Sequence, residues 1–457
     1  MDIRFDADLV RRYGGRGPRY TSYPTAVQFS AQFHNGQYRD NALASNAAAL
    51  PLSLYVHIPF CHELCYYCGC NKIVTRNQAR VSRYLDCLHR EIAMQAELFD
   101  PTRKVEQLHF GGGTPTYIDD RQLGELMDRL DAGFGLDLGA GHEYSIEVDP
   151  RSIDASRIAE LARLGFNRLS LGIQDFDARV QAAVNRKQSL ASVETLVNAA
   201  RAHGFRSISF DLIYGLPQQT RESFSDTLGI VTRLRPDRLA VYNYAHLPER
   251  FKGQRMIRAQ ELPSAADKLA ILGDTVGLLD RAGYCYVGMD HFAVPGDDLV
   301  TARRDGTLQR NFQGYSTHRD TDLVGLGVSS IGSIGNVYSQ NTLTTMDYET
   351  VIEAGQLPIG KGIVVDADDQ LRAAVIQSLM CYDELDFGRF EDVHGVDPRN
   401  YFAAEIDRLG PLADDGLVVL QDDAIRLTDA GRLLMRSVAM MFDRYLGQQE
   451  FRYSKAI

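Results

Sequence analysis

The chain lacks the features that mark membrane-spanning, secreted and nucleic-acid-binding proteins. No run of about 18 apolar residues occurs in its 457 residues, so we expect no transmembrane helix. The first eight residues, MDIRFDAD, contain no apolar signal core, and we therefore expect a cytoplasmic protein. Basic residues are outnumbered, because 49 Lys and Arg accompany 60 Asp and Glu, giving a formal net charge of −11. This balance argues against a general nucleic-acid binder.

Cysteine is scarce, and its distribution argues against a disulfide framework. Four of the seven cysteines lie between Cys61 and Cys70, whereas Cys87, Cys285 and Cys381 are scattered. Disulfide-stapled proteins do not concentrate their cysteines in this way, so we interpret the scattered three as small buried residues. The 11 histidines contain no HxxxH or comparable metal-binding pattern.

The clustered cysteines nevertheless have a metal-binding spacing. Cys61, Cys65 and Cys68 form a CxxxCxxC pattern directly after the apolar run 52–58. Zinc sites commonly use CxxC pairs and four ligands. Three thiolates leave one iron of a [4Fe–4S] cluster without a protein ligand, and an open iron can bind a substrate or second cofactor. The spacing therefore favours a catalytic centre, with a zinc knuckle or chance clustering as the alternative.

The pattern beyond residue 52 predicts an α/β fold. A chain of this length is expected to form two or three domains. Short apolar runs alternate with amphipathic stretches such as 84–98, 121–130, 155–164 and 193–203, which indicates βα units and a parallel sheet. Six strands are expected, and they predict an open partial (β/α)6 barrel: residues 52–58, 105–110, 143–148, 168–173, 207–213 and 238–244.

Distinctive residues follow these expected strands at their carboxyl ends, where parallel barrels place their active sites. The glycines of residues 111–113 would allow a ligand to approach the backbone closely. Glu147 could accept hydrogen bonds from ligand hydroxyls or face a positive charge, whereas Asp149 is more typical of a turn. Considered alone, another set of three is more typical of structural polar contacts: Gln174, Arg186 and Asp211.

Two regions flank the expected barrel, which we place at residues 51–365 with an extension. Residues 1–50 form a leader or lid segment, in which residues 14–24 are too rich in Gly and Pro for a regular element. Residues 366–457 form a small, mainly helical domain, with an apparent hairpin at 416–427 and a final helix through Arg444. This order looks like a winged-helix-type domain, which in an acidic chain we interpret as a cover for the site.

The cysteine spacing is also that of the radical S-adenosylmethionine (SAM) enzymes. Residues 55–72, YVHIPFCHELCYYCGCNK, closely resemble the oxygen-independent coproporphyrinogen III oxidases. A related group of haem-binding chaperones typically has an aromatic residue in place of Cys70 and lacks the segment RYTSYP, present here at 19–24. The similarity to the oxidases continues through further segments: residues 109–117, 145–150, 166–176, 211–217, 242–248, 288–293 and 310–315.

The resemblance implies one [4Fe–4S] cluster and two SAM molecules. Cys61, Cys65 and Cys68 would ligate the cluster, and Cys70 would not. Four residues would contact the first SAM: Tyr55, Gly112, Glu147 and Ile331. Seven would surround the second: Tyr67, which is commonly Phe in the family, and Gly113, Thr114, Gln174, Arg186, Asp211 and Ala245.

The activity implied is oxidative decarboxylation of two propionate side chains of coproporphyrinogen III to vinyl groups, giving protoporphyrinogen IX. We expect a monomer that receives its electron from a protein such as flavodoxin or ferredoxin. The alternatives are a haem-binding chaperone and a radical SAM enzyme acting on another tetrapyrrole. Our hypothesis for the leader is that it closes the barrel mouth and brings basic residues to the acidic substrate, a solvated tail being the alternative: Arg11, Arg12, Arg16 and Arg19.

Overall fold

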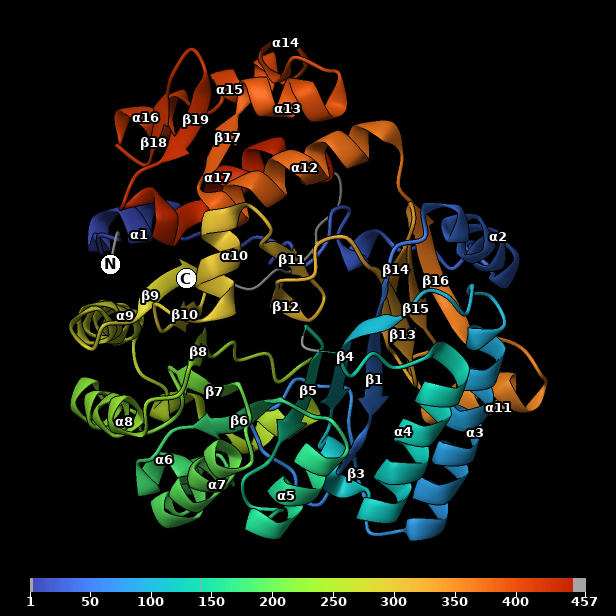
Figure 1. Ribbon diagram of the computed structural model, residues 1–457. Helices are drawn as coiled ribbons and strands as arrows, with labels where there is room; N and C mark the ends of the chain where they lie inside the picture. Colours follow the sequence, from blue (N-terminus) through green and yellow to red (C-terminus); the bar gives the residue numbers. More distant parts are fainter. Residues whose placement is uncertain (1–2, 140, 447–457) are drawn as a thin grey trace.

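The computed structural model describes residues 3–139 and 141–446, and a large mixed sheet is its main feature (Figure 1). Its strand order is β16-β15-β14-β13-β1-β4-β5-β6-β7-β8-β10-β9. The six strands from β1 to β8 in this order are parallel, which confirms the predicted set. They are β1 (Leu52–Ile58), β4 (Val105–Gly112), β5 (Glu143–Val148), β6 (Arg168–Gln174), β7 (Ser207–Tyr214) and β8 (Arg238–Asn243).

Amphipathic helices cover the outer face of these strands (Figure 1). They begin and end at sequence signals, as α4 illustrates. The Asp119 carboxylate accepts from the Gln122 N–H, the Gln122 amide oxygen accepts from the Asp119 N–H, and Gly135 ends the helix in the left-handed region. The helices are α3 (Gln78–Ala96), α4 (Asp120–Phe134), α5 (Ala155–Arg163), α6 (Ala178–Ala183), α7 (Leu190–Ala202), α8 (Arg221–Leu234) and α9 (Ala265–Arg281). In the described part of the chain, no helix has the length and apolarity needed to cross a bilayer.

Short strands extend the parallel core on both edges. On one edge, β13 (Asp322–Leu326) runs parallel to β1 and leads into antiparallel β14 (Ile331–Ile334), β15 (Val337–Asn341) and β16 (Ile359–Val364). On the other, β10 (His291–Ala293) and β9 (Cys285–Gly288) continue antiparallel to β8. Helices α10 (Asp298–Asp305) and α11 (Thr345–Glu353) accompany these extensions.

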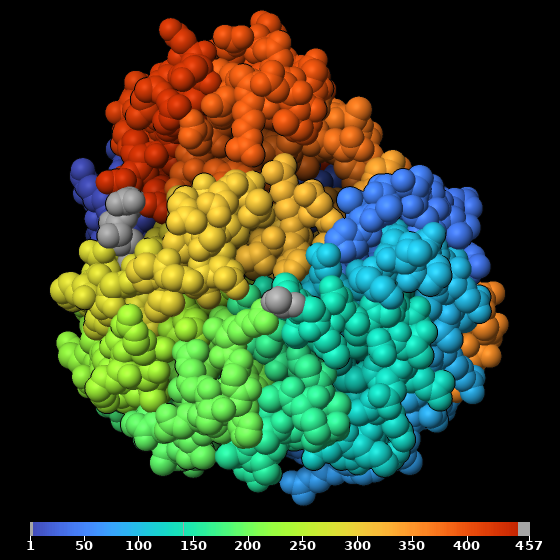
Figure 2. Space-filling model, in the orientation of Figure 1, coloured from blue at the N-terminus to red at the C-terminus, as the bar shows by residue number. Residues whose placement is uncertain are grey.

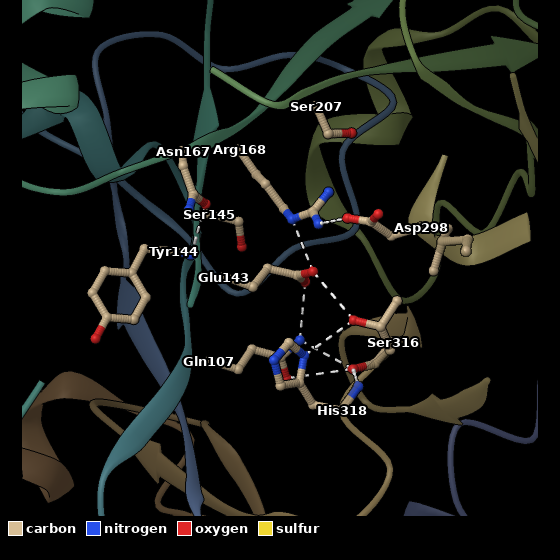
Figure 3. Close-up of polar contacts among 12 residues, drawn as sticks. Gln107, Glu143, Tyr144, Ser145, Asn167, Arg168, Ser207, Asp298, Ser316 and His318 are labelled. Carbon is tan, nitrogen blue, oxygen red and sulfur yellow. Dashed lines mark hydrogen bonds and ion pairs between the residues drawn. The ribbon is translucent and has the colours of Figure 1, made fainter. Parts of the chain in front are cut away.

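A buried polar network fills the inner face near the amino ends of the parallel strands (Figure 3). The hairpin of β11 (Gln309–Asn311) and β12 (Gly314–Ser316) packs there. Gln107 donates to both Glu143 and the Ser316 hydroxyl at 3.0 Å. Arg168 pairs with Glu143 at 2.8 Å and also with Asp298. Burial alone would raise the pKa of Glu143, but the charge of Arg168 lowers it, so the network holds an ionised carboxylate.

Replacing Ser316 with alanine should destabilise the protein by about 1 to 2 kcal/mol, the cost of a lost buried hydrogen bond. Urea unfolding under anaerobic conditions would measure the change. Ser156→Ala is the matched control, because Ser156 is exposed and bonds Asp154 within one helix turn; its effect should stay within about 0.5 kcal/mol. Equal losses in the two variants would show that the hairpin does not depend on this contact.

The leader packs against both the sheet and the C-terminal region. It contains α1 (Ala7–Tyr13) and α2 (Asn35–Ser45), and as predicted residues 14–24 form neither helix nor strand. Its Gly17 and Pro18 carbonyls accept hydrogen bonds from Arg436, and the Tyr20 hydroxyl donates to Asp443 at 3.0 Å. The chain between α1 and α2 therefore bridges the two parts of the molecule.

The C-terminal residues form a lobe of helices and a three-stranded sheet, orange and red in Figure 2. The predicted hairpin is present, since β18 (Val418–Leu420) pairs antiparallel with β19 (Ala424–Leu427), and β17 (Glu384–Asp386) adds a third strand. The predicted final helix is present in broken form: residues 431–434, 435–439 and 440–442 make three consecutive short helical segments that end at Phe442 rather than at Arg444. Residues 431–439 are all buried, and tertiary packing modifies the helical periodicity there. The helical segments are α12 (Ala367–Tyr382), α13 (Phe387–His394), α14 (Pro398–Tyr401), α15 (Ala403–Asp407), α16 (Gly410–Asp414), η6 (Gly431–Leu434), α17 (Met435–Ala439) and η7 (Met440–Phe442).

Candidate cluster and SAM-binding site

The cysteine loop leaves the carboxyl end of β1 and is closed by a two-strand contact. β2 (Phe60–Cys61) pairs in parallel with β3 (Ile73–Val74), which fixes both ends of the loop. Cys61, Cys65 and Cys68 line one hollow of about 560 Å³, here called the cysteine cavity. Cys70 also lines it, so the structure brings all four clustered thiols to one place.

Cationic and hydroxyl donors surround these thiols. The Cys65 Sγ accepts from Arg151 Nη2 and from Arg186 Nη1, each at 3.4 Å, and the Thr114 hydroxyl donates to the Cys61 Sγ at 3.6 Å. A hydrogen bond from the Cys70 thiol, aided by Lys72, lowers the pKa of Cys68 to about 6. Burial raises the pKa of Cys61 to about 11, so its thiolate needs a metal or another cation. This donor set fits an anionic iron–sulfur cluster held by thiolates.

Asp149 orients the two arginines, a role that its sequence position did not indicate. Its carboxylate pairs with Arg151 at 2.6 Å and with Arg186 at 3.2 Å. Although burial would raise the pKa of Asp149, hydrogen bonding and charge from these arginines lower it, so it is ionised at neutral pH. Asp149 also accepts from the Arg151 backbone N–H at 3.1 Å, so the predicted turn is present too. Arg151 carried no signal in the sequence beyond its place after a strand end.

The glycine triplet is required by the protein's own packing as well as by any ligand. A Cβ on Gly113 would lie 2.7 Å from the carbonyl oxygens of Pro59 and Phe60. Gly112 has φ +117°, where a side chain is strained, and its Cβ would lie 2.8 Å from the His57 ring. The Gly113 N–H donates to the Ile58 carbonyl at 2.9 Å. The triplet therefore fits the end of β4 closely against the start of the cysteine loop.

A second hollow of about 440 Å³ adjoins the first, and we call it the Tyr55 cavity. Cys70, Gly112 and Glu147 line both hollows. Within it, the Tyr55 hydroxyl lies 3.1 Å from His57 Nδ1, and Glu147 lies 3.4 Å from His109 Nε2. All four residues expected around a first SAM line this cavity: Tyr55, Gly112, Glu147 and Ile331.

Six of the seven residues expected around a second SAM line the cysteine cavity instead: Tyr67, Gly113, Thr114, Gln174, Arg186 and Asp211. Ala245 is the seventh. It follows β8, is exposed, and does not contribute to the lining of either hollow in the described part of the chain. Gln174 has φ +67° and sits at a register irregularity between β6 and β7. Such a bulge re-aims a side chain, and no sequence pattern predicts it.

Two ring side chains missed as ligand candidates also line the Tyr55 cavity. His109 stacks on Tyr55 with ring centroids 5.8 Å apart and lies 2.6 Å from the Ser145 hydroxyl. The His57 Nε2 lies 3.0 Å from the Asn71 carbonyl oxygen, and burial lowers the pKa of His57. Neutral His57 thus ties β1 to the cysteine loop. Both histidines, His57 and His109, lie two residues from other inward-facing residues of their strands. This strand period of two is the sequence signal that could have placed them in the site.

Comparison with known proteins agrees with this geometry. Residues 55–230 match the family model of the Radical SAM superfamily, and residues 365–434 match that of the HemN C-terminal domain. The oxygen-independent coproporphyrinogen III oxidase of Pseudomonas aeruginosa is 53% identical over 444 residues, covering 97% of this chain and 96% of the relative. The chain belongs to the oxygen-independent coproporphyrinogen III oxidases. The Escherichia coli K12 oxidase of the same name is 49% identical over 452 residues, 98% of this chain and 97% of the relative.

The solved structure of coproporphyrinogen III oxidase (HemN) from Escherichia coli superposes with a TM-score of 0.92 at 48% identity, covering 98% of this chain and 100% of that one. The relative is described as a radical SAM enzyme. Membership of this superfamily implies a [4Fe–4S] cluster and SAM in the present oxidase. The buried thiols and their arginine partners fit the cluster.

Proposed function

We propose that this chain converts two propionate side chains of coproporphyrinogen III to vinyl groups, giving protoporphyrinogen IX without oxygen. The observation that carries this function is the full-length match to named oxidases, together with the cysteine cavity that the strand ends form. When bound, the cluster and SAM supply a 5′-deoxyadenosyl radical that removes a hydrogen atom from the propionate β-carbon. Carbon dioxide and one electron then leave to complete each vinyl group.

We propose that Cys61, Cys65 and Cys68 ligate the cluster. Arg151 and Arg186 would each donate a hydrogen bond to the Cys65 sulfur, and Asp149 would keep both guanidinium groups in place. Hydrogen bonds to cluster sulfurs are one determinant of reduction potential. These arginines therefore tune the ease of reduction in addition to positioning the ligand.

We further propose two SAM molecules, one for each cavity. The division of the candidate residues between the two hollows supports this stoichiometry, because the first set lines the Tyr55 cavity and six of the second set line the cysteine cavity. Glu147 lies where the cavities meet and can accept hydrogen bonds from a ribose. Asp211 and Arg186 would meet the amino and carboxylate groups of the second molecule.

The leader is proposed to act as a lid. Thr21 and Ala26 line the Tyr55 cavity, and Arg19 pairs with Asp290 at the edge of β10. Arg11 and Arg12 instead pair with Asp8 and Asp415. Of these three leader arginines, Arg19 is the one that reaches a cavity wall, since it lies over Tyr242 of the cysteine cavity. A reactive radical needs a site closed to water.

Deleting residues 1–25 should sharply lower coproporphyrinogen turnover while the cluster is retained, because the cavity would open to solvent. Porphyrin products and bound iron would be measured on the same preparation, with SAM binding as the check on folding. Unchanged turnover with an intact cluster would show that the leader is a tail without a closing role.

The remaining assignments stay predictions. We propose residues 51–365 as the catalytic barrel with its extension, 1–50 as the lid, and 366–457 as a winged-helix-like cover. The final residues of that range, 447–457, lie outside the described part of the chain. The cytoplasmic location, the monomeric state and electron donation by a flavodoxin or ferredoxin are likewise predictions.

An anaerobic assay of the reconstituted protein with SAM, dithionite and coproporphyrinogen III tests the proposed function. We expect protoporphyrinogen and 5′-deoxyadenosine to form together. Deoxyadenosine without porphyrin product would point to another tetrapyrrole substrate. Stoichiometric haem binding without either product would contradict the enzyme and favour a haem carrier.

A further inference from the structure

The β11–β12 hairpin carries a buried arginine with an unsatisfied donor. Arg310 is 3% exposed and lies opposite Tyr315, its guanidinium 4.9 Å from the ring centroid. Its Nε donates to the Arg19 carbonyl at 3.1 Å, but its Nη1 has no hydrogen-bond partner among the described residues. A buried guanidinium is costly unless its N–H groups are paired. An anionic partner from outside the protein would pair it.

Other unsatisfied nitrogens lie near the same hairpin. Gln313 Nε2 and His291 Nδ1 have no partner within the described ranges. Gln313 sits at the hairpin tip and lines the Tyr55 cavity. The His291 ring packs between Tyr315 and Tyr242, at 5.3 and 6.1 Å, and Tyr242 lines the cysteine cavity. Gln313 therefore lies in the wall of the Tyr55 cavity itself, and His291 lies directly behind Tyr242 in the wall of the cysteine cavity.

The charge of this region is positive although the chain is acidic. Arg19 stacks over Tyr242 at 5.5 Å and pairs with Asp290. Burial alone would raise the pKa of Asp290, but Arg19 and Arg310 contribute to lowering it, so it is ionised. Asp290 is one carboxylate beside the two guanidinium charges of Arg19 and Arg310, which leaves a surplus positive charge suited to a carboxylate ligand.

We propose that Arg310 and Arg19 bind one propionate carboxylate of the tetrapyrrole. The inference rests on the proposed function, since coproporphyrinogen carries four carboxylates. Arg19 lies over Tyr242, a wall residue of the cysteine cavity, and Arg310 stands on the hairpin whose tip lines the Tyr55 cavity. Arg310 supplies the free Nη1, and Arg19 keeps 37% of its side chain accessible to an incoming ligand. Gln313 adds an amide donor at the cavity wall. This contact would fix which face and edge of the macrocycle meets the radical, so Arg310 is a positioning residue.

The test compares binding of coproporphyrin III with that of its tetramethyl ester, which has no carboxylate charge. The cluster-loaded full chain is titrated anaerobically, and porphyrin fluorescence reports binding. Arg310→Gln should weaken acid binding by roughly 10- to 100-fold, the loss of a charge-assisted hydrogen bond, and leave ester binding unchanged. Arg304→Gln is the matched control, because Arg304 is 75% exposed and pairs with Asp305; it should alter neither.

A second variant predicts the opposite direction and so excludes a folding defect as the cause. Asp290→Asn removes the carboxylate that competes with the ligand, and coproporphyrin III should then bind several-fold more tightly. Equal loss of acid and ester binding in Arg310→Gln, or weaker acid binding in Asp290→Asn, would overturn the proposal. Failure of the proposed function would look different: the wild-type protein would form no deoxyadenosine or protoporphyrinogen, whatever the variants bind.

Discussion

Replacing Cys65 with alanine is expected to remove the iron–sulfur cluster and to abolish 5′-deoxyadenosine formation. The Cys65 sulfur accepts hydrogen bonds from Arg151 and Arg186, at 3.4 Å from each. Without it, only two of the three proposed cysteine ligands remain, too few to hold the cluster. Without the cluster no radical forms, so coproporphyrinogen oxidation should fall to its uncatalysed rate, a loss of roughly a million-fold or more. Iron and sulfide content, with chromatography of deoxyadenosine and porphyrins, would measure both effects.

Two other cysteines provide controls for this prediction. Cys285 lies on β9 and lines neither cavity in the described part of the chain, so Cys285→Ala should keep the full cluster and activity. Cys70 bonds the Cys68 thiol but is proposed not to ligate iron. Cys70→Ser should therefore retain a [4Fe–4S] cluster. If it lost iron as completely as Cys65→Ala, Cys70 would be a ligand and the proposed set would be wrong.

The parallel strands of the fold could be predicted from sequence because each is a short local run of largely apolar residues. Leu52–Ile58 is buried at six of seven positions, and each such run is followed by an amphipathic helix with its own cap. The edge strands could not be predicted in the same way. β9, β10 and β14 have three or four residues, too few for a period, and their pairing depends on tertiary context. The division of the last predicted helix into three short helical segments could not be predicted, because complete burial removes the amphipathic signal.

The site was partly predictable for a related reason. Carboxyl ends of parallel strands meet at one edge, which placed the cysteine loop, Glu147 and Asp211 together. The strand rule says nothing about residues that enter from outside the barrel. Ile331 was expected from the family resemblance alone. Arg310 lies on a hairpin whose short strands could not be predicted from periodicity. The contact of Arg151 and Arg186 with Cys65 could not be predicted from the sequence, because the two arginines lie 86 and 121 residues from that cysteine along the chain.

Asp211 shows how the site trades stability for ligand binding. Its carboxylate lines the cysteine cavity and accepts from the Ser170 hydroxyl at 3.2 Å. Burial, with a further contribution from Glu147, raises the pKa of Asp211 from an ordinary 3.8 to about 7. In the unfolded chain the same group ionises near its ordinary value. Between these two values the native state binds more protons, so stability falls as pH rises from about 4 to 7 and the loss is complete above 7.

Asp211→Asn should therefore stabilise the SAM-free protein at pH 8 by about 4 kcal/mol, since each of about three pKa units corresponds to 1.36 kcal/mol. The gain should shrink as the pH falls and approach zero below about pH 3, where Asp211 is protonated in both the folded and the unfolded protein. Urea unfolding at several pH values would measure it. The same variant should lose binding of the proposed second SAM, because a neutral amide attracts its cationic groups weakly. Equilibrium dialysis would show one SAM bound where the wild type binds two.

The matched control for Asp211→Asn is the removal of a carboxylate from the surface, which tests whether loss of any negative charge stabilises the protein. Asp226 is exposed on α8, and Asp226→Asn should change stability by no more than about 0.5 kcal/mol at any of these pH values. Asp211→Asn could instead be less stable than the wild type at pH 8. That result would mean that the protein itself stabilises the ionised carboxylate of Asp211. The carboxylate would then be a structural group, and its position in the cavity would not argue for a second SAM. A stabilised variant with one SAM fewer would mean that Asp211 is retained for its ligand at the expense of the fold.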